Sequence, residues 1–356
     1  MTTLTGPVLV VGAGLLGTSV GLALRRTGVE VLLHDVNPEN VKIASGLGAG
    51  AAASTGDRAQ LVVVAVPPDH LADEIVAALR VGDRFVTDVG SVKSDPLLEV
   101  TMRVDAAALT RYVGSHPLAG SERSGPLAAS SVLFDGRPWA VTPHGTSDAA
   151  ATALVSELAR LCGGSPVTFT PLEHDLAVAR TSHLPHLLAA LVAGRLAEAP
   201  TSHLALSGQG VRDVTRIAAG DPALWQQIVA ANAGALTELL SEVRGDLDLL
   251  LAALQDGERD AVAALLGRGV AGTAAIPGKH GGPAQVDSAL FVAVPDHPGE
   301  LARLLADAGE IGVNIEDLRI DHDPARPVGL VELTVAADRV EFLLESLEER
   351  GWTTHR

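Results

Sequence analysis

The sequence predicts an α/β fold in three parts: a doubly wound parallel-sheet domain, an all-α helical domain and a small α+β module. Three observations support this prediction. Short apolar runs alternate with helical segments up to about residue 170, helical spacing alone continues to about residue 267, and a glycine- and proline-rich stretch precedes the final segment. We therefore expect domains at 1–170, 171–267 and 286–356, with a linker at 268–285.

Composition limits the classes of function. The chain has 356 residues, 47% of them hydrophobic, and a formal net charge of -17 without any run of lysine or arginine, which gives no electrostatic basis for binding nucleic acid or an anionic membrane. Cys162 is the only cysteine, so no internal disulfide can form. No apolar stretch reaches 18 residues and no basic signal-peptide region begins the chain, so a cytoplasmic protein is predicted.

The first domain begins with a buried strand at 8–11, a glycine turn, a helix, and a second strand, "EVLLHD". Helical segments are expected at 71–79 and 96–102. The apolar runs around them fit buried parallel strands: "QLVVVAVPPDH", "DRFVTDVGSVK" and "PWAVTP".

The helical domain is predicted from "SHLPHLLAALVAGRLAEA" and from a longer stretch that Asp221 and Pro222 begin as cap and first-turn residue. That longer stretch carries one apolar stripe, made by Leu224, Ile228, Leu236, Leu239, Leu240, Val243, Leu247 and Leu250. The C-terminal module is predicted to have strands at 289–294, 315–320 and 329–336 and helices at 299–308 and 339–350.

The glycine turn predicts a dinucleotide site. Gly12, Gly14 and Gly17 form G-x-G-x-x-G between a strand and a helix, where backbone amides can meet a pyrophosphate. Asp35 ends the next strand, where its carboxylate can bind both ribose hydroxyls, and no arginine follows it, which favours NAD over NADP. The expected cofactor-binding residues are Gly12, Gly14, Leu15, Leu16, Gly17, Asp35, Val66 and Pro67.

Three polar residues follow later strands at the edge where ligands of such sheets bind. Ser91 could bond a substrate hydroxyl or simply cap a turn, and Lys93 could attract an anionic substrate. His116, in "GSHPLAG", is a titratable group beside the predicted cofactor. An imidazole there can accept the proton of a hydroxyl group that loses hydride.

A second polar cluster lies in the helical domain. His183 and His186 are three residues apart with Ser182 adjacent, and Asp213 and Arg216 have the same spacing, so each pair shares a helix face. Arg216 could bind a carboxylate, or it could form an ordinary ion pair with Asp213. No metal site is predicted, because no third ligand accompanies the two histidines.

The set "GAGLLGTS", "DVGSVKS", "GSHPLAGSERSG", "HDLAVARTSHLPHLLA" and "RDVTRIAAGDPALW" closely resembles the prephenate dehydrogenase family. The resemblance implies a Rossmann-like domain, NAD as cofactor, and oxidative decarboxylation of prephenate in tyrosine biosynthesis. It implies that His116 accepts a hydrogen bond from the ring hydroxyl and that Ser91 positions it. The substrate-binding residues that it implies are Ser121, Glu122, Ser182, His183, His186 and Arg216, with Lys93 as a further candidate.

The last module resembles an ACT domain, through "VPDHPGELARLLADAGEIGVNIEDL". That resemblance implies an effector site formed by Pro298, Gly299, Asn314 and Ile315, with tyrosine or another aromatic amino acid as inhibitor. A module that only dimerises is the alternative. Long apolar stripes in the helical domain favour a homodimer.

Three other functions remain open or are disfavoured. Arogenate dehydrogenase is the main alternative, because arogenate differs from prephenate at one group, for which Glu122 is a candidate partner. A 3-hydroxyacid dehydrogenase is disfavoured, since residues 171–254 contain no lysine to act as acid or base. A regulator that senses NAD and an amino acid without turnover is the non-enzymatic alternative.

Overall fold

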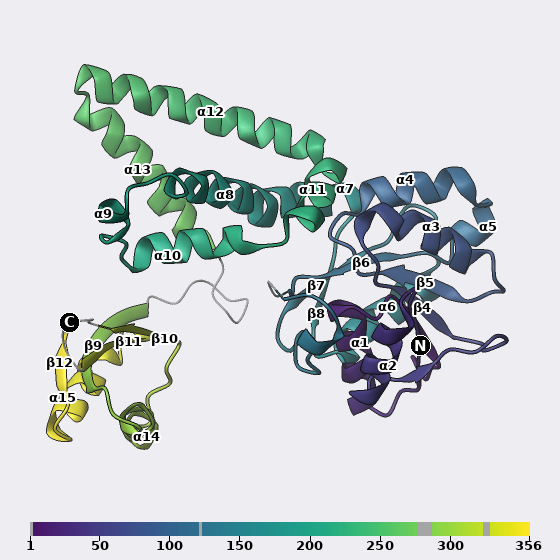
Figure 1. Cartoon of the computed structure of the whole chain (residues 1–356), viewed down its shortest axis with the longest axis horizontal. Helices are drawn as coiled ribbons and strands as arrows, with labels where there is room; N and C mark the ends of the chain where they lie inside the picture. The colour runs from purple at the N-terminus through teal and green to yellow at the C-terminus, as the bar shows by residue number, and fades with distance from the viewer. Residues whose placement is uncertain (1–2, 121–122, 277–286, 323–327) are drawn as a thin grey trace. The chain divides into compact units, whose positions relative to one another are not determined.

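The computed structural model describes residues 3–120, 123–276, 287–322 and 328–356. The chain forms two compact units, Met1–Arg244 and Gly245–Arg356 (Figure 1). The first unit holds the sheet domain and most of the helices, so it contains nearly all of the residues that the sequence assigned to a site.

A five-stranded parallel sheet of order β3-β2-β1-β4-β5 forms the first domain, which confirms the Rossmann-like prediction. Its strands are β1 (Val8–Val11), β2 (Val31–His34), β3 (Ala51–Ala52), β4 (Leu61–Val64) and β5 (Phe85–Asp88). The helices of this domain are α1 (Leu15–Arg26), α2 (Pro38–Gly46), α3 (Pro68–Leu79), α4 (Ser94–Arg103), α5 (Ala106–Leu109) and α6 (Ala149–Leu161).

Both faces of the sheet are covered, as the apolar runs of its strands require. In β4 all four residues are buried. Leu61 and Val63 join one hydrophobic cluster with residues of α1 and α6, whereas Val62 and Val64 join another with residues of α3 and α4. Successive side chains of the strand thus enter opposite layers.

A second sheet differs from the prediction. Its strands are β6 (Gly114–Pro117), β7 (Pro138–Thr142) and β8 (Ser165–Thr168), and β7 runs antiparallel to β6 although "PWAVTP" was expected to be parallel. The chain between β6 and β7 contains only a 3-10 turn, Pro126–Ala128, among its described residues. An antiparallel pair needs no helical crossover, whereas a parallel pair does.

The helical region follows β8, as predicted. It consists of α7 (Pro171–Val178), a π-helical turn (Ala179–His183), α8 (Leu184–Leu196), α9 (Thr201–Leu204), α10 (Gln209–Arg216), a 3-10 turn (Ile217–Ala219), α11 (Pro222–Ala231), α12 (Ala233–Asp256) and α13 (Arg259–Ala274). Two features differ from the prediction. The long apolar stripe is divided between α11 and α12 at Asn232, and α13 occupies the first part of the expected linker, 268–285.

The helical segment Pro171–Leu196 is, by length and composition, apolar enough to cross a membrane. It nevertheless buries His174, Asp175 and His183 inside the protein. Ionisable groups of this kind are costly within a bilayer, so we interpret the segment as part of the helical domain.

The C-terminal module is a four-stranded antiparallel sheet of order β10-β11-β9-β12 with two helices. Its elements are β9 (Asp287–Pro295), α14 (Glu300–Ile311), β10 (Asp317–His322), β11 (Val328–Ala336), α15 (Val340–Glu349) and β12 (Thr353–His355). The sequence analysis missed the short β12. Residues of both helices and of the strands form a separate hydrophobic core, so the module has its own source of stability.

Candidate active site

The turn between β1 and α1 uses its three glycines in two ways. A Cβ at Gly12 would lie 2.4 Å from the carbonyl oxygen of Ala65, and one at Gly17 would lie 1.9 Å from the carbonyl oxygen of Gly12. At Gly14, the N-cap of α1, an added Cβ would meet nothing within 4 Å. Two glycines therefore allow tight packing, while the third leaves open space at a helix N-terminus, and this arrangement fits a pyrophosphate.

Asp35 follows β2 and lies against the same turn. Its carboxylate accepts hydrogen bonds from the backbone N–H of Ala13 at 2.7 Å and of Asn37 at 2.8 Å, and from the side chain of Asn40 at 3.3 Å. The carboxylate is half-buried. It thereby links the end of β2 to the glycine turn, where a ribose would be bound.

The other expected cofactor residues surround this turn. Leu15 and Leu16 form the first turn of α1, and both are half-buried. A methyl group of Val66 would lie 3.1 Å from a Cβ at Gly12, and Pro67 caps α3. The residues predicted from three separate segments therefore converge at the carboxyl ends of β1, β2 and β4.

Lys93 has a different role from the predicted one. Its side chain is 1% exposed; its ammonium group bonds Asp88 and also donates to the carbonyl oxygen of Ser115 at 2.7 Å. Tyr112 donates its hydroxyl to the same Asp88 carboxylate at 2.9 Å, and burial, followed by Asp88, raises the pKa of that phenol. Because Lys93 compensates a buried carboxylate, it is not available to a substrate.

His116 lies on β6 beside the carboxyl end of β5. A parallel bridge between Val86 and Tyr112 places β6 next to β5, and Ser115 donates its hydroxyl to the carbonyl oxygen of Asp88 at 2.7 Å. Since successive strand residues face opposite sides, Ser115 is buried whereas His116 is half-buried. The imidazole is thus held at the sheet edge where ligands bind.

A hydrogen-bonded chain extends from His116 into the protein. Its Nδ1 lies 3.0 Å from Nε2 of His174, and Nδ1 of His174 lies 2.8 Å from Oδ1 of Asp175. The two imidazole rings meet edge to face, 5.2 Å between centroids. Burial, together with His174, Lys93 and His183, holds the pKa of His116 well below its usual value, so His116 is neutral and can accept a proton.

Ser91 lies in the loop between β5 and α4 and is half-buried. The loop is fixed on both sides of this serine. The N–H of Gly90 donates to Asp88 at 2.9 Å, and the N–H groups of Lys93 and Ser94 each donate to the Asp175 carboxylate at 2.8 Å. The same carboxylate that bonds His174 therefore anchors the loop that carries Ser91.

The second histidine cluster is assembled at the π-helical turn. Ser182 and His183 lie within this turn and His186 in the first turn of α8; irregular turns of this kind are frequent at functional sites. Nδ1 of His183 accepts a hydrogen bond from Asn232 at 3.2 Å, and burial lowers the pKa of His183 to about 4. His186 stacks on Trp225, with ring centroids 3.5 Å apart and planes within 8°.

Arg216 ends α10, which packs against α8. Its side chain is exposed, and it forms no ion pair with any residue that the structure describes. Asp213 accepts a hydrogen bond from Gln209 at 3.0 Å instead of pairing with Arg216. The ion-pair alternative is therefore not realised, and the guanidinium is free to bind an anion. Ser121 and Glu122 lie outside the described residues.

Two family models match the chain. Residues 20–168 match "Prephenate dehydrogenase, nucleotide-binding domain", and residues 170–268 match "Prephenate dehydrogenase, dimerization domain". A "Probable prephenate dehydrogenase NovF" of Streptomyces niveus is 37% identical over 97% of this chain and 98% of its own length. The chain belongs to the prephenate dehydrogenase family. Its members include the prephenate dehydrogenase of Bacillus subtilis, which is 26% identical over 96% of both chains.

Solved structures agree with this membership. The prephenate dehydrogenase of Aquifex aeolicus in complex with hydroxyphenyl propionate and NAD+ has a TM-score of 0.67 and 27% identity, over 75% of this chain and 96% of that one. The arogenate dehydrogenase of Synechocystis has a TM-score of 0.64 and 25% identity, over 75% of this chain and 98% of that one. The chain is thus an NAD-dependent oxidoreductase of the prephenate dehydrogenase family.

Four residues of the site were not assigned by the sequence analysis: the buried His174, Asp175 and Asn232, and the half-buried Trp225. The first two follow a capping box in which Thr170 and Glu173 bond each other's backbone N–H groups and fix the start of α7. That box is readable in "TPLE". It predicts that the next two residues occupy the second helical turn, but it does not indicate which strand they face.

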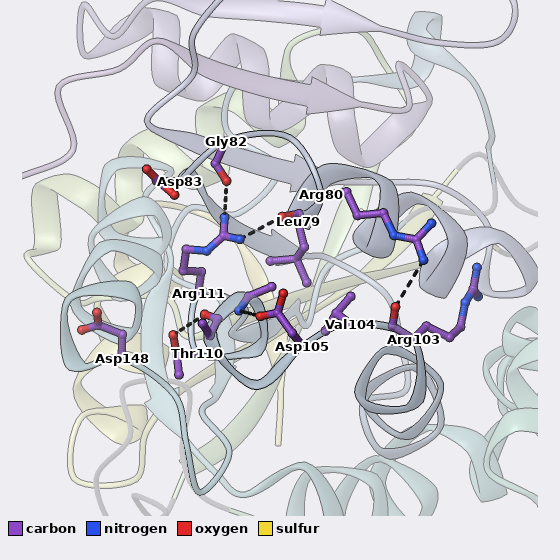
Figure 2. A pocket seen from close by; sticks show the side chains of 12 residues that line it. Leu79, Arg80, Gly82, Asp83, Arg103, Val104, Asp105, Thr110, Arg111 and Asp148 are labelled. Carbon is purple, nitrogen blue, oxygen red and sulfur yellow. Dashed lines mark hydrogen bonds between the residues drawn. The ribbon is translucent and has the colours of Figure 1, made fainter.

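The structure also contains a cavity that is separate from the candidate active site. A cavity of about 720 Å³ is lined by residues at the amino end of β5 and around α5, away from His116 (Figure 2). Arg111 donates to the carbonyl oxygens of Leu79, Gly82 and Arg84 at 2.8–3.0 Å, and Arg80 donates to that of Arg103 at 3.2 Å. These guanidinium groups hold loops together, so we assign the cavity no chemistry.

Proposed function

We propose that this protein oxidises prephenate with NAD and releases carbon dioxide, giving 4-hydroxyphenylpyruvate. The observation that carries the proposal is the hydrogen-bonded His116 at the ligand-binding edge of the sheet, in a chain of this family. A base at this position suits removal of hydride from a carbinol carbon, because the hydroxyl proton must leave at the same time.

NAD, held at the turn between β1 and α1, would supply the acceptor for the hydride of ring carbon 4. His116 takes the proton of the 4-hydroxyl, and Ser91 orients that hydroxyl group toward the imidazole. As the ring carbonyl develops, the bond to the ring carboxylate breaks and carbon dioxide leaves. The electron pair of that bond makes the ring aromatic, and the resulting phenolate oxygen takes its proton back from His116. Ser182, His183 and His186 line the pocket, and we infer that the neutral His183 donates a hydrogen bond through Nε2, since its Nδ1 accepts one from Asn232.

The substrate is a dianion, whereas the protein has a net charge of -17. Screening acts over about 8 Å at physiological salt, so nearby groups determine binding. With Lys93 engaged by Asp88, Arg216 is the best placed cation for a substrate carboxylate, because it is exposed and unpaired among the described residues.

Arogenate is the second candidate substrate, and the likeness to the Synechocystis arogenate dehydrogenase supports it. The two substrates differ only where arogenate carries an amine in place of a ketone. Steady-state NAD reduction with each substrate separates them, and we expect prephenate to be preferred.

The test of the reaction compares the wild-type protein with His116→Asn. The variant keeps a polar side chain but loses the base, so kcat with prephenate should fall by about 10²- to 10⁴-fold, while NAD binding, measured by fluorescence titration, should persist. Turnover of arogenate alone would change the substrate and keep the mechanism. No turnover with either compound would favour a regulator that senses NAD.

We propose an ACT-like effector site in the C-terminal module for tyrosine or another aromatic amino acid. Gly299 begins α14 with a φ of +97°, next to exposed Pro298, and Asn314 and Ile315 precede β10. A cavity of about 160 Å³ adjoins this turn and is lined by Val294, Pro295, Asp296, His297, Leu301, Ile320, Gly329 and Val331. It is smaller than the roughly 300 Å³ of ordinary ligand pockets, so a complete site would need a second module.

We also propose a homodimer and a cytoplasmic location. The match of residues 170–268 to a dimerization domain supports the dimer. In the single chain, large apolar side chains of α12 and α13 are more than half exposed, among them Leu249, Leu254, Leu266 and Val270. A partner subunit would cover such a surface. The location rests on the composition of the chain alone.

A further inference from the structure

With His174 neutral, the hydrogen-bonded series His116–His174–Asp175 has one consistent arrangement of protons. Burial raises the pKa of the Asp175 carboxyl, but hydrogen bonds from His174, Ser94 and Lys93 outweigh it and hold that pKa below its usual value. Asp175 is therefore ionised and accepts the Nδ1 proton of His174. The Nε2 of a neutral His174 then accepts, so His116 carries its proton on Nδ1 and presents a free Nε2.

Burial separates the roles of these groups. The side chains of His174 and Asp175 are 2% and 4% exposed, whereas His116 is half-buried. His116 is therefore the member of the chain that can reach a substrate, and the other two act through it. The other charged or titratable groups that face His116 are Lys93, which is paired with Asp88, and His183.

We propose that His174, oriented by Asp175, is a positioning residue that relays a proton for His116. This inference rests on the proposed function. The substrate hydroxyl proton passes to Nε2 of His116, and the Nδ1 proton of His116 passes to Nε2 of His174. The hydride leaves with its electron pair to NAD, and the O–H electron pair becomes the second bond of the carbonyl. The positive charge then lies on His174, next to the Asp175 carboxylate, where it is best compensated.

The variant His174→Gln tests this relay in the full-length protein. A glutamine oxygen can still accept the Nδ1 proton of His116, but it cannot be protonated. We expect kcat with the preferred substrate to fall by at least about tenfold, less than the 10²- to 10⁴-fold attributed to a complete general base. The acidic limb of the kcat/KM profile should move to lower pH. A proton taken up by the pair can no longer rest on His174 beside Asp175 and must stay on His116, whose pKa burial holds low.

Thr170→Val is the matched control. It removes the cap of the same helix, α7, without touching the relay, so it should lower stability and leave the pH profile in place. The relay would be overturned if the acidic limb of His174→Gln stayed at its wild-type position and its kcat stayed within about twofold of wild type. Turnover by the wild-type protein would still support the proposed function in that case. Loss of wild-type turnover would instead reject the function.

If the His174→Gln variant does not fold, the relay can still be tested by a measurement that needs no turnover. Long-range ¹H–¹⁵N spectra of the imidazoles in the wild-type protein with NAD report which nitrogen carries each proton. We expect the Nδ1–H tautomer for both His116 and His174 near pH 7.5. An Nε2–H tautomer of His116 would overturn the relay.

Discussion

At the scale of single residues, burial of His183 should make the stability of the protein depend on pH. Its pKa is about 4 in the folded protein because of burial, compared with about 6.5 in an unfolded chain. Between these values only the unfolded chain binds the proton. The contribution of His183 to the free energy of unfolding should therefore be complete above pH 6.5. It should fall by about 3 kcal/mol as the pH decreases to 4.

Urea unfolding of the wild-type protein and of His183→Gln between pH 4 and pH 7 measures this contribution. Other groups titrate in both proteins, so the informative quantity is the difference between the two curves. The wild-type protein should lose about 3 kcal/mol more than the variant across this range. Parallel curves would show that folding does not lower the pKa of His183.

The same scale shows what the sequence could predict of the site. His116 was predicted from its place after an apolar run beside a glycine turn, and the structure puts it at the sheet edge. Lys93 was predicted to meet substrate from the same reasoning, but its buried partner Asp88 lies five residues earlier, in β5. Spacing along the chain locates a residue at an edge of the sheet, whereas the direction of its side chain depends on packing between strands.

At the scale of elements, the turn between β1 and α1 allows cofactor binding to be separated from folding. Gly17→Ala would push a Cβ against the backbone of Gly12, so it should unfold or strongly destabilise the domain. Gly14→Ala meets nothing within 4 Å, and its φ of -80° suits alanine. The Gly14→Ala variant should keep wild-type stability and lose NAD affinity by at least about tenfold, because the methyl group occupies the approach of the pyrophosphate.

Thermal unfolding together with NAD titration by fluorescence checks both variants. Gly28→Ala is the comparison for a glycine in open space away from the turn: its φ of +82° strains alanine, so it should lose some stability and keep NAD affinity. Undiminished NAD affinity in Gly14→Ala would show that the cofactor does not approach α1 at this residue.

Elements were predicted where one periodicity covers a whole segment, as in β1, α1 and β4. The predicted boundaries of elements were wrong where a tertiary contact determines the boundary. The break at Asn232 divides a continuous apolar stripe, because its side chain donates hydrogen bonds to His183 and to the backbone of Asp175. The region 268–274 contains two glycines, Gly269 and Gly272, which lie inside α13. Glycine lowers helix propensity by about 1 kcal/mol per residue, so a linker was predicted there.

At the scale of the whole molecule, the proposed catalytic and regulatory functions occupy parts with separate cores. The groups from Gly12 to Arg216 lie in the unit Met1–Arg244, and the hydrophobic core of the last module contains only residues of that module. Deletion of residues 286–356 should therefore leave NAD-dependent turnover and abolish inhibition by tyrosine. Initial rates at increasing tyrosine concentration, for the full chain and the deletion variant, measure this. Inhibition that persists after the deletion would place the effector in the active site, where tyrosine would compete with a substrate of similar shape, and raising the substrate concentration would then relieve it.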